Sequence, residues 1–186
     1  PPPSPQPSRR RVQQGEPLFN ALFHQAQQQF RSERWNAEPN WEEVWLYSFD
    51  RGSALVAPLS PSGPAQCFLT APLRGAEILT LYVVEIEWEE SASLPGQVRL
   101  YNPTGEIILQ GRLPGGEGRR SLSPKHRPSG HPMPLQAICC RQPDFSICLA
   151  EGVAACYGCC CYTPASCAAC LAGIAALCAA LLCYIC

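Results

Sequence analysis

The sequence predicts an α+β N-terminal domain, with one amphipathic helix on an antiparallel meander, followed by a small disulfide-rich helical C-terminal unit. Three observations lead to this fold class: apolar residues at helical spacing near the N-terminus, period-two alternation in the middle of the chain, and twelve cysteines in residues 139–186. With 186 residues, the chain has room for one ordinary domain and a tail.

The N-terminal residues divide into a polar arm and a helix. Residues 1–15 are rich in Pro and Arg and show no apolar periodicity, so we expect a disordered arm there. Pro17 occupies a favourable first helical position. After it, apolar side chains recur every three or four residues, which predicts an amphipathic helix; they are Leu18, Phe19, Leu22, Phe23, Ala26 and Phe30.

Residues 16–112 are predicted to form the α+β domain, acting as a leader or pro-domain. The clearest strand alternates Val84 and Ile86 with Glu85 and Glu87, as expected when one face of a sheet is buried and the other is solvated. Turn residues separate the strands and favour an antiparallel meander. The predicted strands are 44–49, 54–56, 66–70, 78–88, 98–101 and 106–110.

Residues 113–135 change composition and predict a flexible linker, because Gly and Pro are frequent and apolar residues are scarce. Two features mark it as a candidate for processing. Arg119 and Arg120 form a dibasic site, and Gly115 and Gly116 resemble the double-glycine end of some exported leaders. Exposed linkers of this kind are accessible to proteases.

Residues 136–186 are predicted to form a cysteine-rich apolar helical peptide. No charged side chain follows Glu151. A unit of this size buries little apolar surface, and disulfides worth about 2–4 kcal/mol each compensate for that. Cys67 lies apart and is expected to be a buried thiol. The disulfide candidates are Cys139, Cys140, Cys148, Cys156, Cys159, Cys160, Cys161, Cys167, Cys170, Cys178, Cys183 and Cys186.

Pro164 divides this peptide into a loop-rich cysteine cluster and an Ala- and Leu-rich helix. At about 100° per residue, each half places three cysteines on one face. The spacing therefore predicts a helical hairpin with disulfides along its seam. The two sets are Cys148, Cys156 and Cys159, and Cys167, Cys170 and Cys178.

The C-terminal segment resembles the halocin-like cysteine-rich bacteriocin precursors. The residues that carry the resemblance are Cys156-x-x-Cys159, Cys167-Ala-Ala-Cys170, Cys178 and Cys183-x-x-Cys186. The resemblance implies an antimicrobial C-terminal peptide, and an N-terminal part that provides immunity or holds the product inactive. We therefore expect a precursor whose peptide is secreted after processing and attacks the target-cell membrane, and whose N-terminal domain contacts the peptide before release.

Two alternatives remain open at this point. Residues 167–186 are uncharged and long enough to span a bilayer, which favours a tail-anchored membrane protein with a palmitoylated C-terminal helix. The Cys-x-x-Cys pairs suit a metal-binding module. We expect no enzyme, because His24, His126 and His131 lie at positions expected to be solvated. No cofactor or metal ligand is assigned, and a net charge of −1 argues against a nucleic-acid partner.

Overall fold

The computed structural model describes residues 7–60, 65–88, 95–112, 138–161 and 164–185. Its strands are β1 (Ser8–Arg11), β2 (Glu38–Pro39), β3 (Trp45–Phe49), β4 (Gly52–Ser60), β5 (Ala65–Arg74), β6 (Glu77–Ile78), β7 (Tyr82–Trp88), β8 (Pro95–Tyr101), β9 (Ile107–Arg112), β10 (Ile138–Cys140) and β11 (Cys183–Ile185). Its helices are α1 (Pro17–Gln29), α2 (Ser32–Trp35), α3 (Gln142–Cys159) and α4 (Pro164–Leu182).

The predicted fold class is confirmed. Seven strands form an antiparallel sheet in the order β1-β3-β4-β5-β7-β8-β9, with β2 paired to β4 and β6 paired to β5. From β3 onward, neighbours along this path follow each other in the chain, apart from the short strand β6, so the sheet is a meander. Strands β10 and β11 form a separate antiparallel pair, which brings the beginning and the end of the C-terminal unit together.

The N-terminal arm contributes an edge strand. The composition of residues 1–15 predicts disorder, but Ser8–Arg11 form β1 and pair with β3. The Arg9 guanidinium lies 4.7 Å from the centre of the Trp45 ring, a cation–π contact. The buried side chain of Val12 follows, and its N–H donates to the Val44 carbonyl at 2.8 Å. Backbone pairing and these tertiary contacts therefore order a segment that has no periodicity of its own.

Helix α1 covers one face of the sheet, as its spacing predicts. Pro lies in its first turn, and Phe19, Leu22 and Ala26 are buried. These side chains belong to a cluster with Leu55 and Leu69 of the central strands. Alternation along β4 and β5 then directs Val56 and Phe68 to the opposite face, so both faces of the central sheet are apolar.

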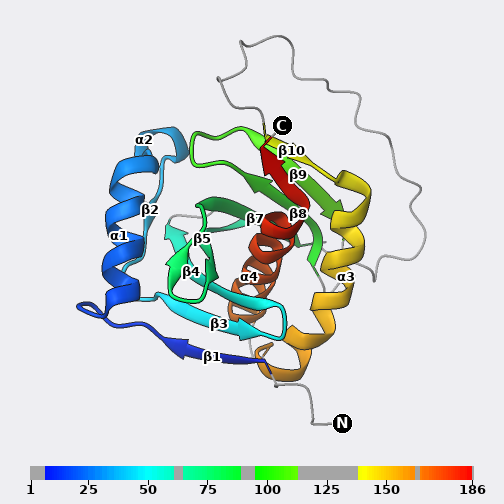
Figure 1. The fold of residues 1–186 in the computed structure, drawn as a ribbon, viewed down its shortest axis with the longest axis horizontal. Coiled ribbons are helices and arrows are strands. Elements are labelled where there is room, and N and C mark those ends of the chain that lie inside the picture. The colour runs from blue at the N-terminus through cyan, green and yellow to red at the C-terminus, as the bar shows by residue number, and fades with distance from the viewer. Residues whose placement is uncertain (1–6, 61–64, 89–94, 113–137, 162–163, 186) are drawn as a thin grey trace.

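The opposite face of the sheet packs against the C-terminal unit. Helix α4 contacts β4, β5, β7 and β8, and α3 lies beside α4 and contacts β9. Figure 1 shows α4 running across the concave side of the curved sheet, with α3 outside it and α1 on the far face. Val84 and Ile86 are buried, as their alternation predicts, and they lie in one cluster with Leu171 and Ala175 of α4. The sheet and the C-terminal unit thus share one hydrophobic core.

Two glycines set how closely the C-terminal helices approach their neighbours. A Cβ on Gly152 of α3 would lie 2.4 Å from Cγ2 of Ile174 on α4, so the two helices cross where no side chain intervenes. A Cβ on Gly111 of β9 would lie 2.9 Å from Leu149 and 3.1 Å from Phe145, which lets α3 pack directly on the strand. By contrast, a Cβ on Gly173 would meet Val56 at 3.5 Å, an ordinary contact.

We expect Gly152→Ala to lower the free energy of unfolding by about 1–3 kcal/mol, because the added methyl group overpacks the crossing of α3 and α4. Gly173→Ala is the matched control: its methyl group fits, and better helix propensity should raise stability by up to about 1 kcal/mol. Urea unfolding measures both. A Gly152→Ala protein as stable as the Gly173→Ala protein would contradict the close crossing.

Candidate functional site

The C-terminal unit is a helical hairpin whose turn is set by Pro164. Proline cannot continue a helix from its N-terminal side but is well placed at the start of a new one. Accordingly α3 ends at Cys159 and α4 begins at Pro164. The first half of the hairpin is predicted to be loop-rich, but it forms the helix α3 instead. The helix continues through Gly152, whose lack of a side chain allows the close crossing with Ile174.

Two disulfides join the facing sides of the hairpin, as the cysteine stripes predict. Cys148 bonds to Cys178, with Cα atoms 5.9 Å apart, and Cys156 bonds to Cys170, with Cα atoms 5.8 Å apart. They span 30 and 14 residues of chain. By the chain-entropy estimate, loops of these lengths stabilise the folded unit by about 3–4 kcal/mol each. The hairpin is therefore held along most of its length by covalent bonds.

The cysteines at the turn also form disulfides. Cys159 bonds to its neighbour Cys160, and Cys161 bonds to Cys167. Cys183, at the start of β11, is disulfide-bonded as well. Of the remaining candidates, Cys139 and Cys140 lie in β10, where the structure describes their backbone, and Cys186 lies outside the described residues. The processing candidates Gly115, Gly116, Arg119 and Arg120 also lie outside them.

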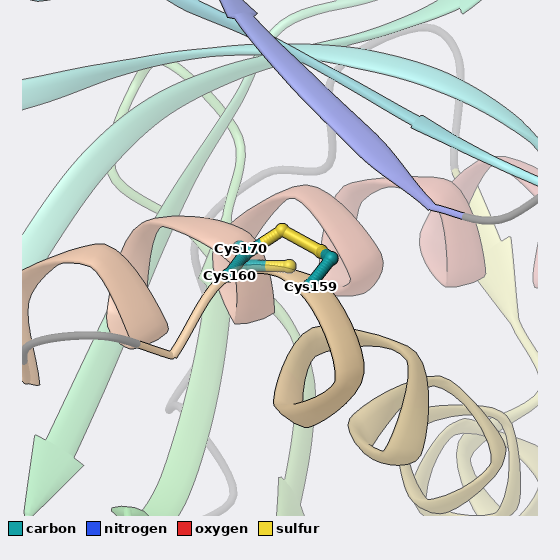
Figure 2. Close-up of side chains that lie close together, drawn as sticks. All are labelled: Cys159, Cys160 and Cys170. Carbon is teal, nitrogen blue, oxygen red and sulfur yellow. A yellow bond between two sulfur atoms is a disulfide. The ribbon is translucent and has the colours of Figure 1, made fainter.

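One group of sulfur atoms among the described residues has the spacing of a metal site. The sulfur atoms of Cys159, Cys160 and Cys170 lie within 4.8 Å of one another, where the end of α3 meets α4 (Figure 2). All three are in disulfides, and a disulfide sulfur lacks the thiolate charge that binds a metal ion. The oxidised hairpin therefore offers no thiolate at this position, whereas the reduced thiols would suit a soft metal ion.

Helix α4 combines the composition of a membrane span with the burial of a core helix. Residues Ala165–Leu182 have a mean hydropathy of 2.2, high enough for a span, yet 72% of this window is buried inside the protein. The burial is shared between α3 and the sheet. Each buried Leu or Ile side chain contributes about 1.5–3 kcal/mol to this packing. The sheet therefore takes the place that lipid would have around a spanning helix.

A pocket of about 400 Å³ opens beside the Cys148–Cys178 disulfide, and both cysteines line it. Apolar groups form much of its wall, including Phe49, Ile174 and Leu177. Because Phe49 belongs to β3 and the other two to α4, the pocket lies where the sheet meets the hairpin.

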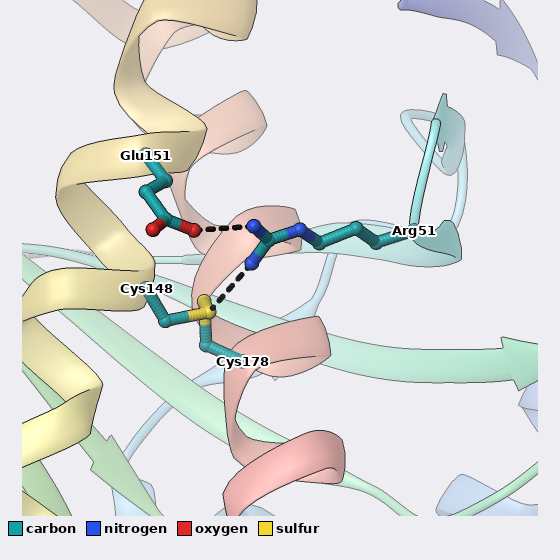
Figure 3. Close-up of a disulfide and its surroundings, with 4 residues drawn as sticks. All are labelled: Arg51, Cys148, Glu151 and Cys178. Carbon is teal, nitrogen blue, oxygen red and sulfur yellow. Dashed lines mark hydrogen bonds and ion pairs between the residues drawn. A yellow bond between two sulfur atoms is a disulfide. The ribbon is translucent and has the colours of Figure 1, made fainter.

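Arg51, in the turn between β3 and β4, reaches across this pocket to α3 (Figure 3). Its guanidinium forms an ion pair with Glu151 and donates a hydrogen bond to the sulfur of Cys148 at 3.8 Å. Sequence reasoning missed this contact. The only clue to it is that Glu151 is the last charged residue of the chain, which does not reveal that Arg51 is its partner.

Cys67 is the only cysteine upstream of residue 139, and it is free. It lies on β5, half-buried, with its sulfur 4.0 Å from a carboxylate oxygen of Glu85. Burial, with a smaller contribution from the Glu85 charge, raises its pKa to about 11. Nearby, Arg99 forms ion pairs with Glu85 and Glu87 across β7 and β8. Cys67 is thus a protonated, unreactive thiol near neutral pH.

Comparison with protein-family models, curated proteins and solved structures finds no match to this chain.

Peptide mapping of the non-reduced chain should recover the two seam disulfides, Cys148–Cys178 and Cys156–Cys170, as cross-linked peptides. Each pair lies on facing sides of α3 and α4, with Cα atoms 5.9 Å and 5.8 Å apart. Mapping after reduction is the control, since each cross-link should then separate into two peptides. Recovery of a Cys148–Cys156 or Cys170–Cys178 bond would mean that the helices do not face each other as described.

We expect iodoacetamide to alkylate Cys67 at pH 8 roughly 100-fold more slowly in the folded protein than in the urea-unfolded protein with its disulfides intact. The reagent attacks the thiolate, and folding raises the pKa of Cys67 to about 11 from an ordinary value near 8.5. Mass spectrometry of the Cys67 peptide follows the reaction. The rate in the folded protein should rise as the pH approaches 11; equal rates in both states at pH 8 would show that the thiol is not shielded.

Proposed function

We propose that the chain is the precursor of a secreted, disulfide-stapled antimicrobial peptide, and that its α+β domain sheathes the apolar hairpin until release. The burial of α4 on the concave face of the sheet carries this proposal. A segment with no charge after Glu151 and with a span-like hydropathy would insert into the producing cell's own membrane or aggregate if exposed. The sheet removes that surface from solvent.

The disulfides support the proposal that the hairpin acts after it has separated from the sheet. The sheet already provides extensive packing to α3 and α4, so the intact fold has a large source of stability besides the disulfides. Staples along the seam hold the two helices together when the sheet is absent. They are also stable in the oxidising conditions outside a cell. The hairpin is thus built to keep its shape after separation.

The outer surface of the hairpin supports a membrane target. Ile147, Tyr157 and Leu181 are 60%, 46% and 62% exposed even in the intact protein. Removing the sheet would expose the buried face of α4 as well. The charged residues of the unit, Arg141, Asp144 and Glu151, all precede α4, which carries none. A rigid helical unit with so apolar a helix partitions into the boundary between lipid headgroups and acyl chains. This agrees with the resemblance of its cysteine pattern to halocin-like bacteriocin precursors.

The two alternatives receive less support from the same residues. Palmitoylation needs free thiols, whereas nine cysteines between Cys148 and Cys183 are in disulfides. A spanning α4 would also lose its packing on the sheet. A metal-binding module needs thiolates, and the closest sulfur group, at Cys159, Cys160 and Cys170, is oxidised. Palmitoylation of these nine cysteines and metal binding by this group therefore both require reduced thiols.

A liposome assay on the full chain tests the proposal. The protein is cleaved at Arg119-Arg120 with a protease specific for paired basic residues and added to vesicles loaded with a self-quenching dye. The same protease can cut at Arg9-Arg10-Arg11, and the Arg119→Ala/Arg120→Ala control protein retains that site. We expect the cleaved protein to release dye at micromolar concentration, because the hairpin can then leave the sheet for the bilayer, while the intact protein releases little. Sedimentation with the vesicles shows whether residues 136–186 have left the sheet.

The Arg119→Ala/Arg120→Ala protein, treated with the same protease, is the matched control and should remain inactive. A second sample is cleaved, reduced and alkylated to test the role of the disulfides. It should release less dye than the cleaved protein with intact disulfides. If the cleaved hairpin sediments with the vesicles but releases no dye, membrane attack is wrong. If cleavage leaves it bound to the sheet in the presence of lipid, the sheath role is wrong.

A further inference from the structure

We propose that the pocket beside Arg51 is a reaction site for small uncharged thiols, which open the Cys148–Cys178 disulfide by thiol–disulfide exchange with Cys148 as the leaving thiolate. This inference does not depend on the membrane activity proposed above. It rests on three observations at one place: the pocket, the disulfide in its wall, and a cation beside one of the two sulfur atoms.

The pocket determines which reductants fit. Its volume of about 400 Å³ lies in the range of pockets that take small molecules. Its charged lining residues are Asp50, Arg51 and Glu151, which together carry one net negative charge. Because the rest of the lining is largely apolar, a neutral thiol is favoured over an anionic one.

The position of Arg51 determines which sulfur leaves. Negative charge develops on the departing sulfur during exchange, so a neighbouring cation speeds its departure. The Arg51 guanidinium donates to the sulfur of Cys148, and the ion pair with Glu151 holds it there. Figure 3 shows the guanidinium lying between the carboxylate and the disulfide. The attacking thiolate therefore bonds to the sulfur of Cys178.

The exchange balances in two steps. A thiol that has entered the pocket loses its proton to solvent and attacks the sulfur of Cys178 as the thiolate; the bond between the two protein sulfurs breaks, and its electron pair remains on Cys148 as a thiolate, which takes up a proton from solvent. A second thiol, or the second sulfur of a dithiol, then attacks the mixed disulfide and releases Cys178. The reductant is oxidised to a disulfide, and the protein disulfide takes up two electrons and two protons. This opens the longer of the two seam loops, while Cys156–Cys170 still closes the hairpin.

The Cys156–Cys170 disulfide provides an internal reference. Cys156 and Cys170 are 0% exposed and do not line the pocket, whereas Cys148 and Cys178 are 8% and 2% exposed and line it. No arginine is described beside it. Under limiting reductant, exchange at Cys148–Cys178 should therefore precede exchange at Cys156–Cys170 in the same molecule.

The test follows both disulfides in the full chain during reaction with dithiothreitol, by acid quenching, alkylation and peptide mass spectrometry. We expect Cys148–Cys178 to open first. Arg51→Gln should slow its opening roughly three- to tenfold, because the leaving thiolate loses a cation that lowers its pKa; the rate at Cys156–Cys170 should not change. Arg51→Lys retains the charge and should recover most of the rate. Arg74→Gln, which removes an exposed arginine at the end of β5, is the matched control.

Trapping identifies the attacked sulfur. Brief treatment with 2-mercaptoethanol, followed by alkylation, should give a mixed disulfide on Cys178 and an alkylated Cys148. The opposite labelling would overturn the assignment of the leaving group. Equal slowing of both disulfides in Arg51→Gln would mean that Arg51 acts only through stability, and opening of Cys156–Cys170 first would overturn the site itself.

Discussion

The packing of α4 on the concave face of the sheet is the contact on which the other features depend. It requires apolar side chains on one face of β4, β5, β7 and β8, and on β4 and β5 these come in addition to the apolar face that packs with α1. It fixes the place of α3, which fills the space between α4 and β9. This packing also explains why α4 has no charged residue. The helix is surrounded mainly by the sheet and α3 rather than by water, so a charged side chain there would be buried without a partner.

Most charged residues lie in the part of the chain that forms the sheet, whereas α4, which packs on the sheet, carries none. The charged side chains end at Glu151, and the disulfide cysteines lie beyond the sheet in the sequence. Arg51 links the sheet to the hairpin. It lies in the β3–β4 turn, and its guanidinium contacts Glu151 and Cys148 of α3. An arginine can do this because its long apolar stem crosses the pocket while its guanidinium keeps two partners.

Local patterns in the sequence predict much of this fold, and contacts between distant segments account for the rest. The spacing of Phe19, Leu22 and Ala26 predicts α1, and the alternation around Val84 predicts β7, because each pattern is complete within its own element. The cysteine stripes predict the seam for the same reason. By contrast, β1 forms only because the edge of β3 is available to it. Likewise, the partner of Glu151 lies 100 residues away, a separation at which periodicity carries no information.

The isolation of Cys67 has a consequence for how the two parts are joined. It is free, and no other cysteine precedes residue 139, so no disulfide ties the sheet to the hairpin. One break in the main chain between β9 and β10 would turn a unimolecular fold into a complex of two chains. Its persistence would then follow mass action: dilution would separate the parts, and any surface that binds the hairpin would draw it away from the sheet.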